Sequence, residues 1–582
     1  MKSITFLSSS LKNTLAWRLV PTQNAKREKW GMLTMGLWDS KEQRLQLLCE
    51  LVEIPSVTGS QAEYDFPYQV VERLNKLQYF QEFPSHLQLH PTGDGRHVVT
   101  ALVKRTQDAA DTVVLLSHYD VVDVQDYGSL REQAFRPNEL TALLHRDSNI
   151  LPEDALSDVR NGNWLFGRGT MDMKCGLALH MSILEQACNQ MFDGNILLVT
   201  VPDEEVNSAG MHSAVSVLTE LARTHNLNYQ LMLNSEPVFP RYPGDRTNYV
   251  YTGSIGKVLP GFLCYGQEAH VGEPWSGLNG NYMVSMLTNE LELSRDLCEE
   301  VDGELTPPPT NLIQKGLKDD YSAQIPHRAV TLFNMFVYKR QMQDVVNVLV
   351  KTAQHAASKI EAAHKAKARA FSEFYHTNNA NISVSVMTYA ELHDYAVSTY
   401  GEQIVRETLE QALRNYDTRD HRDAAVRQVN QLATLCRERA PMIVLFFAPP
   451  YYPAVSSASH RLVPSVVETI THKAKRQFGI TLQHQKYFGG ISDLSFVGLE
   501  HPAETLVSYI DNNPLWPESY SLPLEAMAQL TVPVFNLGPI GRDAHKWTER
   551  LDVDYAFTTL YELLELCIRT IFAQVAISNG DA

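Results

Sequence analysis

The stretch "VVLLSHYDVVDV", residues 113–124, decides the fold because an apolar run in it ends abruptly at His118 and Asp120. The run does not alternate with polar residues, which is typical of a strand buried on both faces of an α/β sheet. Three further runs share this character: "NILLVTV" (195–201), "YQLMLN" (229–234) and "VPVFNLG" (532–538). Helical segments separate them, so the chain is expected to contain an α/β domain whose mixed central sheet is flanked by helices.

Composition sets limits on the class of protein. The chain has 582 residues and a formal charge of −17. This length predicts two or three domains, and the charge argues against nucleic acid and an anionic membrane surface as partners. No apolar run reaches the roughly 18 residues of a membrane span. The seven cysteines are scattered without a C-x-x-C pair, which favours a reducing cytoplasm over a disulfide framework.

The chain divides into four expected parts. Residues 1–35 form a poorly defined N-terminal extension. It fits a transit-type segment or, as we favour, an upstream start codon before Met32 or Met35. Residues 36–248 and 440–582 are expected to form the two halves of one domain. Residues 249–439 read as an insertion with strands of another sheet and long helical stretches at 343–375 and 401–439. The apolar run "PMIVLFFAPPYYP" (441–453) marks the expected return.

Each strand of the first domain is followed by potential metal ligands. These are His118, Asp172 in "GRGTMDMKCG", Glu204 and Glu205 after "LLVTVPD", Glu236 after "LMLNS", and His545 in "GPIGRDAHKWTERLDV". Taken singly, each also fits a turn, a helix cap or a solvated surface. Ligand sites of open α/β sheets lie beyond the carboxyl ends of the strands, so these residues could converge. Histidine with carboxylates suits Zn²⁺, and two ions about 4 Å apart can share one carboxylate and activate water.

The motifs "HYDVV", "GRGTMDMKCG", "PDEE", "NSEP" and "AHKWTERLDV" together resemble the dinuclear zinc peptidases and deacylases of peptidase family M20. That family includes aminoacylase, carboxypeptidase G, acetylornithine deacetylase and succinyl-diaminopimelate desuccinylase. The segments "LLCELVEIPSVTGS" and "FGGISDLSF" and the helical insertion resemble most the branch of the arginine-utilisation protein RocB. Cys175 departs from the family, which commonly has Gly there, and we interpret it as a packed thiol.

The resemblance implies a zinc-peptidase-type catalytic domain that holds two Zn²⁺ per chain, with Co or Mn as substitutes. One ion would be bound by His118, Asp172 and Glu236, and the other by Asp172, Glu205 and His545. Glu204 would act as the general base and acid. Asp120 would orient the imidazole of His118.

The insertion would be an α+β lid and dimerisation domain with extra helices. His270, in "GQEAHVGEPWSGLN", matches a lid histidine that stabilises the oxyanion, often in the partner subunit. It also fits an ordinary strand edge. Asn279 matches a substrate-binding position, and a helix cap explains it equally well. Asp493 matches an Asp near the metals that orients either a ligand or the backbone.

The resemblance therefore implies a metal-dependent hydrolase that cleaves a C–N bond (amide, peptide or ureido) of a small amino-acid derivative. It further implies a cytoplasmic homodimer, joined through the lid, in arginine or ornithine metabolism. The alternative is a non-catalytic homologue, stabilised by metal, that acts as a binding or regulatory partner in amino-acid metabolism. Glu204 favours the enzyme, because a structural metal site would not need a carboxylate beside the ligand Glu205.

Overall fold

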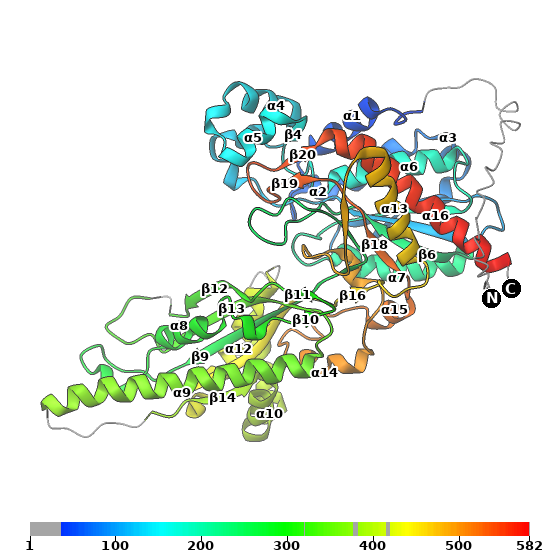
Figure 1. Ribbon diagram of the computed structural model, residues 1–582. Helices are drawn as coiled ribbons and strands as arrows, with labels where there is room; N and C mark the ends of the chain where they lie inside the picture. The colour runs from blue at the N-terminus through cyan, green and yellow to red at the C-terminus, as the bar shows by residue number, and fades with distance from the viewer. Residues whose placement is uncertain (1–35, 319, 376–381, 415–419, 581–582) are drawn as a thin grey trace, which may run out of the picture.

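The computed structural model describes residues 36–318, 320–375, 382–414 and 420–580. Two lobes, each built around one sheet, lie end to end (Figure 1). The expected N-terminal extension, residues 1–35, lies outside the described residues. Within the described ranges, no helix combines the length and apolar character that a bilayer crossing requires.

The first lobe contains a mixed sheet of eight strands in the order β1-β2-β5-β3-β6-β18-β7-β17. β3 runs parallel to β5 and β6, whereas β2 is antiparallel to β1 and β5. This confirms the predicted α/β class with a mixed central sheet. The strands are β1 (Leu87–Pro91), β2 (His97–Val103), β3 (Asp111–His118), β5 (Asn195–Val201), β6 (Asn228–Asn234), β7 (Asn248–Tyr251), β17 (Leu482–Gln485) and β18 (Val534–Asn536).

Helices cover both faces of this sheet, which explains the unbroken apolar run in β3. Val113 and Leu115 pack in one core with α1 (Lys41–Val52), α6 (Lys174–Cys188) and α16 (Tyr561–Gly580). Val114 and Leu116 point to the other face, in a core that includes α7 (Ala209–His225). All four side chains are fully buried. The strand is therefore held rigidly, and His118 is its last residue.

The second lobe contains a five-stranded sheet in the order β12-β13-β9-β15-β14. Long helices pack on it, and α9 agrees with the helix expected over 343–375. The stretch expected at 401–439 contains two separate helices, α11 and α12, and its residues 415–419 lie outside the described ranges. The elements are β9 (Gly256–Tyr265), α8 (Gly280–Leu291), β12 (Thr310–Gly316), β13 (Arg328–Val337), α9 (Met342–Tyr375), β14 (Ser385–Thr388), α10 (Tyr389–Tyr400), α11 (Glu402–Leu413), α12 (His421–Leu435) and β15 (Met442–Tyr452).

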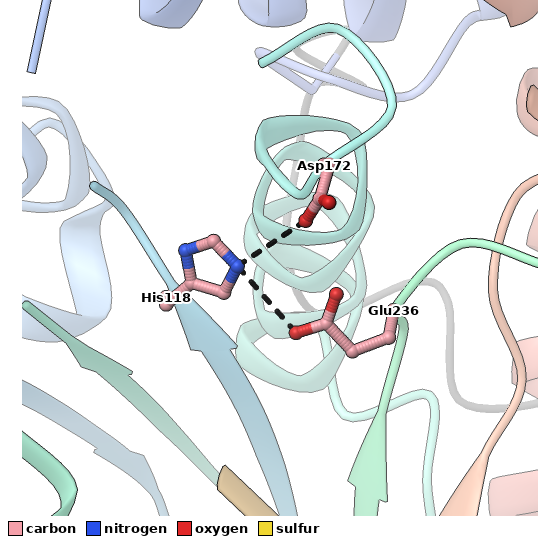
Figure 2. Close-up of side chains that lie close together, drawn as sticks. All are labelled: His118, Asp172 and Glu236. Atoms are coloured by element: carbon pink, nitrogen blue, oxygen red, sulfur yellow. Dashed lines mark ion pairs between the residues drawn. The ribbon is translucent and has the colours of Figure 1, made fainter. Parts of the chain in front are cut away.

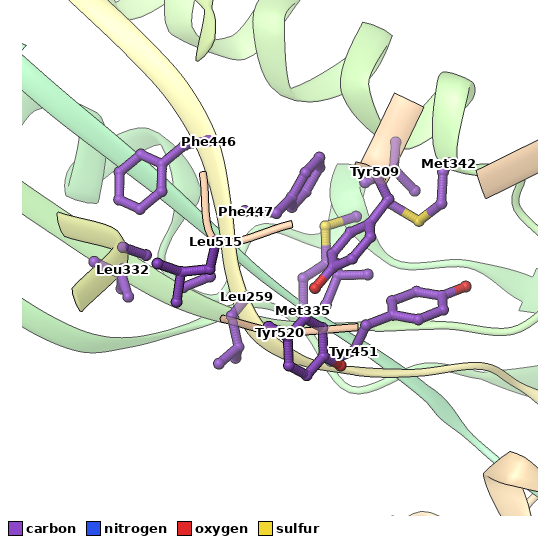
Figure 3. Packing of buried hydrophobic residues seen from close by; sticks show 14 of the residues in the cluster. Leu259, Leu332, Met335, Met342, Phe446, Phe447, Tyr451, Tyr509, Leu515 and Tyr520 are labelled. Atoms are coloured by element: carbon purple, nitrogen blue, oxygen red, sulfur yellow. The ribbon is translucent and has the colours of Figure 1, made fainter. Parts of the chain in front are cut away.

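The strand pairing differs from the expected domain boundaries at 249 and 440. β7 pairs with β17 in the first sheet, so that sheet includes residues up to Tyr251. β15, expected to mark the return to the first domain, pairs with β9 and β14 in the second sheet. Tyr509, Leu515 and Tyr520 also pack against β9 and β15 in this core (Figure 3). An apolar run predicts a buried strand, but it does not indicate which sheet the strand joins.

A small three-stranded sheet completes the first lobe. Its order is β19 (Gly541–Arg542), β20 (Arg550–Asp552) and β4 (Trp164–Phe166). It joins the segment before Asp172 to the segment around His545. The remaining main helices are α2 (Gln61–Leu74), α4 (Pro137–Arg146), α5 (Glu153–Asn161) and α13 (Val463–Phe478).

Candidate metal centre

Two groups of possible ligands share one carboxylate at the carboxyl ends of the central strands. The Nε2 atom of His118 lies 3.4 Å from Oδ1 of Asp172 and 3.5 Å from Oε1 of Glu236 (Figure 2). The Nε2 atom of His545 lies 3.3 Å from Oδ2 of Asp172 and 3.1 Å from Oε2 of Glu205. The structure thus brings together all five residues expected as ligands, with Asp172 between the two groups.

These residues fit a pair of divalent cations. In each group the possible ligand atoms all lie within 4.8 Å of one another. Nδ1 of His118 lies 3.0 Å from the backbone oxygen of Asp120, so the tautomer that donates there leaves the Nε2 lone pair free. Among the described residues Nε2 is buried without a hydrogen-bond partner. A buried nitrogen facing carboxylates in this way is suited to a cation.

The electrostatics of the site also favour positive charge. Burial raises the pKa of Glu236 well above its usual value, and the neighbouring Asp172 raises it further, although His118 opposes this. Burial and Asp172 likewise raise the pKa of Glu205. Burial alone would lower the pKa of His118, but Glu236 and the adjacent aspartates outweigh it and raise that pKa. A bound cation would favour the ionised carboxylates and the neutral imidazole.

Asp120 contacts the Glu204 loop in addition to the His118 ring that it was expected to orient. Its Oδ1 atom lies 3.5 Å from Nδ1 of His118. The same carboxylate accepts hydrogen bonds from the backbone N–H groups of Glu204 (3.1 Å) and Glu205 (3.3 Å) and from the hydroxyl of Thr58 (2.8 Å). Asp120 therefore holds the Glu204 loop against the end of β3.

Glu204 lies beside the first group of ligands. Its Oε2 atom is 3.9 Å from Nε2 of His118. Burial raises the pKa of its carboxyl group well above the usual value, His118 opposes this, and Glu236 and Asp493 add to the rise. The preceding residue, Asp203, adopts the left-handed conformation with φ of +68° and is held by an ion pair with Arg96 at 2.8 Å. The loop thus has a defined, locally strained conformation.

An ion pair within two of the quoted motifs was not predicted. Arg168, in "GRGTMDM", donates to Oε2 of Glu549, in "AHKWTERLDV", at 2.8 Å, and both side chains are almost fully buried. Oε1 of Glu549 also accepts from the N–H of Met171, next to Asp172. The pair connects the Asp172 loop to the His545 loop. Opposite charges within two such motifs are the signal from which it could have been found.

The motif "DMKCG" contributes to packing as well. Lys174 is fully buried, and its ammonium donates to the carbonyl oxygens of Leu51 (3.0 Å) and Ile54 (2.7 Å). This anchors the start of α6 to the end of α1. Cys175 is a buried free thiol and lies outside both groups of candidate ligands.

The three remaining candidates lie in different surroundings. His270 is exposed in the second lobe, bridges to Gln324, and accepts the N–H of Gly272 at 3.0 Å. In the described chain it contacts none of the ligand residues. Asn279 caps α8 by accepting the N–H of Asn281 at 2.8 Å.

Asp493, by contrast, lies near the candidate ligands. It is 2% exposed, and neither of its carboxylate oxygens is hydrogen-bonded within the described ranges. Burial raises its pKa to about 7, and the nearby His118 opposes this rise. Its charge in turn raises the pKa of both Glu204 and Glu236. Asp493 is thus a buried carboxyl group beside the site.

A mixed α/β sheet that gathers histidines and carboxylates at its strand ends provides ligands suited to a divalent metal ion. The family described as "Peptidase family M20/M25/M40" matches residues 114–532. The chain belongs to this family. The protein is 46% identical over 537 residues to the uncharacterized protein YqjN of Bacillus subtilis (strain 168), covering 92% of this chain and 98% of YqjN. It is 30% identical over 536 residues to protein RocB of the same organism, covering 89% and 93%.

Solved structures share the fold at low sequence identity. The M20 family metallo-carboxypeptidase Sso-CP2 from Sulfolobus solfataricus matches with a TM-score of 0.51 at 13% identity, covering 91% of this chain and 99% of that chain. The dipeptidase Dug1p from Saccharomyces cerevisiae matches with a TM-score of 0.51 at 11% identity, covering 91% and 96%. These likenesses concern the fold, and membership of the family indicates a hydrolase.

Proposed function

We propose that the protein is a dizinc hydrolase that cleaves a C–N bond (amide, peptide or ureido) in a small amino-acid derivative. The observation that carries this proposal is the sharing of Asp172 between two ligand groups with Glu204 alongside. His118, Asp172 and Glu236 would hold one ion, and Asp172, Glu205 and His545 the other. Two ions bound there would polarise the scissile carbonyl group and lower the pKa of water.

The protein's own groups would handle the protons. Glu204 would accept a proton from the attacking water and later donate it to the leaving amine, since a carboxyl group with a raised pKa can do both. Asp120 would keep the Glu204 loop and the His118 ring in place. Asp493 would orient a ligand or the backbone near Glu204.

The second lobe would be the lid and dimerisation domain. The exposed position of His270 supports this proposal, because a residue that acts in a partner's active site need not approach the site of its own chain. Asn279 would contribute to substrate binding beyond its cap. We also propose that the protein is a cytoplasmic homodimer and that it acts on an arginine- or ornithine-related compound. The similarity to RocB supports this part of the proposal.

The test is a hydrolysis screen of zinc-loaded protein with N-acyl, N-carbamoyl and dipeptide derivatives of arginine, citrulline and ornithine. We expect release of a free amine or acid from at least one compound and about two zinc ions per chain. Glu204→Gln should keep the metals and lose turnover by about 10²-fold or more. Two bound ions without turnover of any compound would instead favour the non-catalytic, regulatory homologue. A chain that binds no metal would contradict both.

A further inference from the structure

Arg96 is a buried cation, directly before β2, that the proposed mechanism does not use. It is 8% exposed. Its Nη1 atom lies 3.1 Å from Oε1 of Glu63 and 2.8 Å from Oδ1 of Asp203. Its Nε atom donates to Oδ2 of Asp94 at 2.9 Å. One planar guanidinium group thus joins three carboxylates, an arrangement that the fork of an arginine allows and the single ammonium of a lysine does not.

The three carboxylates come from separate segments of the first lobe. Glu63 lies on α2 and is fully buried. Asp94 lies in the loop between β1 and β2, and Asp203 follows β5, directly before Glu204. Arg96 therefore connects the Glu204 loop to a helix and a loop that carry none of the expected metal ligands.

The turn at Asp203 is the part of the Glu204 loop that Arg96 holds. Asp203 has φ of +68°, which is uncommon for a residue other than glycine and persists where the surroundings hold it. Its backbone oxygen accepts the N–H groups of Asn207 at 3.2 Å and Ser208 at 2.6 Å. Its Oδ2 atom accepts the N–H of Ala209, the first residue of α7, at 3.0 Å. Because the other carboxylate oxygen contacts Arg96, the guanidinium and the start of α7 hold the turn between them.

The backbone around Glu204 is thus held at two points. Its N–H donates to the carboxylate of Asp120 at 3.1 Å, and the preceding residue is held through its side chain by Arg96. We infer that Arg96 is a positioning residue, which places the carboxyl group of Glu204 by holding Asp203 in its turn. Misplacement by about 1 Å can slow a catalysed step about 10²-fold. The inference rests on the proposed function for the role of Glu204 as the general base.

Arg96→Lys in the zinc-loaded full chain is the first test. The ammonium keeps the positive charge but cannot contact Asp94 and Asp203 together, so the turn should loosen. We expect kcat to fall by about 10- to 100-fold, while KM and the content of about two zinc ions per chain stay unchanged. Steady-state kinetics on a compound that the wild-type protein hydrolyses, together with elemental analysis, measure these quantities. An unchanged kcat overturns the inference.

Arg44→Lys is the matched control, because Arg44 is equally buried and also makes several contacts. It is 6% exposed and donates to the backbone oxygens of Asp39 at 2.7 Å and Phe557 at 3.1 Å, neither of which is an expected ligand. This variant should lower the midpoint of urea unfolding and leave kcat unchanged. An equal fall of kcat in both variants would show that lost stability explains the effect, and it would overturn the inference.

A double variant separates positioning from a general disturbance of the site. Glu204→Gln removes the proposed general base, so its residual turnover should not fall further when Arg96→Lys is added. A further fall of about 10-fold would mean that Arg96 acts through another group, and it would overturn the inference.

Hydrogen exchange tests the same contact without turnover. In Arg96→Lys the backbone amides of residues 204–209 should exchange about 10-fold faster, or more, than in the wild-type protein, and in Arg44→Lys at the wild-type rate. Mass spectrometry of peptides from this segment measures the rates. Wild-type exchange in Arg96→Lys overturns the inference. If the wild-type protein hydrolyses no compound, the proposed function fails, and faster exchange would still identify Arg96 as the residue that holds this turn.

A second variant serves if Arg96→Lys does not fold. Asp203→Asn removes one charge from the same contact, and asparagine tolerates a positive φ. It should lower kcat and speed exchange in the same direction, and wild-type values of both would overturn the inference.

Discussion

The carboxylate of Asp120 accepts a hydrogen bond from the backbone N–H of Glu204 at 3.1 Å. Asp120 also lies next to the ring of His118, through its backbone oxygen at 3.0 Å. One residue therefore fixes both the imidazole at the end of β3 and the loop that carries the proposed general base. The relative position of these two groups depends on a single fully buried carboxylate.

Asp120→Asn should lower kcat by about 10- to 100-fold, as is typical for residues behind metal ligands. The asparagine can offer only one acceptor oxygen, so the N–H of either Glu204 or Glu205 would face an amide N–H group. Steady-state kinetics and metal analysis check this. Thr58→Val, which removes one hydrogen bond to the same carboxylate, should have a smaller effect. Unchanged kcat in Asp120→Asn would show that the loop is held by other contacts.

Glu549→Gln should destabilise the protein by up to about 3–5 kcal/mol, because it leaves the buried guanidinium of Arg168 with only the partly exposed Asp126 as an anionic partner. The midpoint of urea unfolding measures the change. Replacing both partners, as Arg168→Met with Glu549→Leu, should cost less than Glu549→Gln alone. The surface pair of Arg146 and Asp147 is the control, and Asp147→Asn should leave the midpoint nearly unchanged. A double variant as unstable as the single one would contradict this account.

His545→Ala should reduce the metal content from about two ions to about one per chain after dialysis. The side chain of His545 is 48% exposed, whereas that of His118 is 1% exposed. The ion on the His545 side should accordingly exchange faster with solvent in the unaltered protein. Elemental analysis by mass spectrometry and isotope exchange measure both quantities. Retention of two ions by the variant would mean that another group replaces the histidine.

His180 should make the metal-free protein less stable as the pH falls. Its Nε2 atom lies 2.9 Å from Oγ of Ser235, and burial lowers its pKa from 6.5 to about 3. The imidazole is neutral in the folded protein and gains a proton more easily in the unfolded chain. The contribution of the neutral His180 to the free energy of unfolding is therefore complete above pH 6.5. It decreases toward pH 3, by about 2 kcal/mol at pH 5.

The variant His180→Gln can keep the bond to Ser235 and does not titrate. The difference between its urea midpoints at pH 7 and pH 5 should be smaller than that of the wild type. Equal differences would show that His180 is not the residue that links protonation to unfolding.

The central sheet could be predicted from the sequence because β3, β5 and β6 are buried on both faces and read as unbroken apolar runs. β1, β2, β7 and β17 were not predicted. β1 and β17 are only partly apolar, whereas β2 is an apolar run of the same kind as β3. The convergence of His118, Asp172 and Glu236 followed from the rule that strand ends meet at one edge of a sheet.

Contacts between residues that strand pairing brings together from distant parts of the chain could not be predicted from local sequence patterns. The membership of β15 in the second sheet depends on its register with β9, which local composition does not encode. The same pairing places Lys257 beside Tyr452. The hydrogen bond that the backbone N–H of Glu204 donates to Asp120 depends on the turn at Asp203, whose positive φ is not evident from the residue type.

The connection between Arg168 and Glu549 also bears on how the protein is made. Glu549 and His545 are among the last residues of the first lobe to be synthesised, whereas β3 and the Asp172 loop leave the ribosome early. Translation proceeds at about 5–20 residues per second, so the early carboxylates and Arg168 await their partners while the whole second lobe is added. The second ligand group, which needs His545, should therefore be completed only when the final segment emerges, whereas His118, Asp172 and Glu236 are all made before the second lobe.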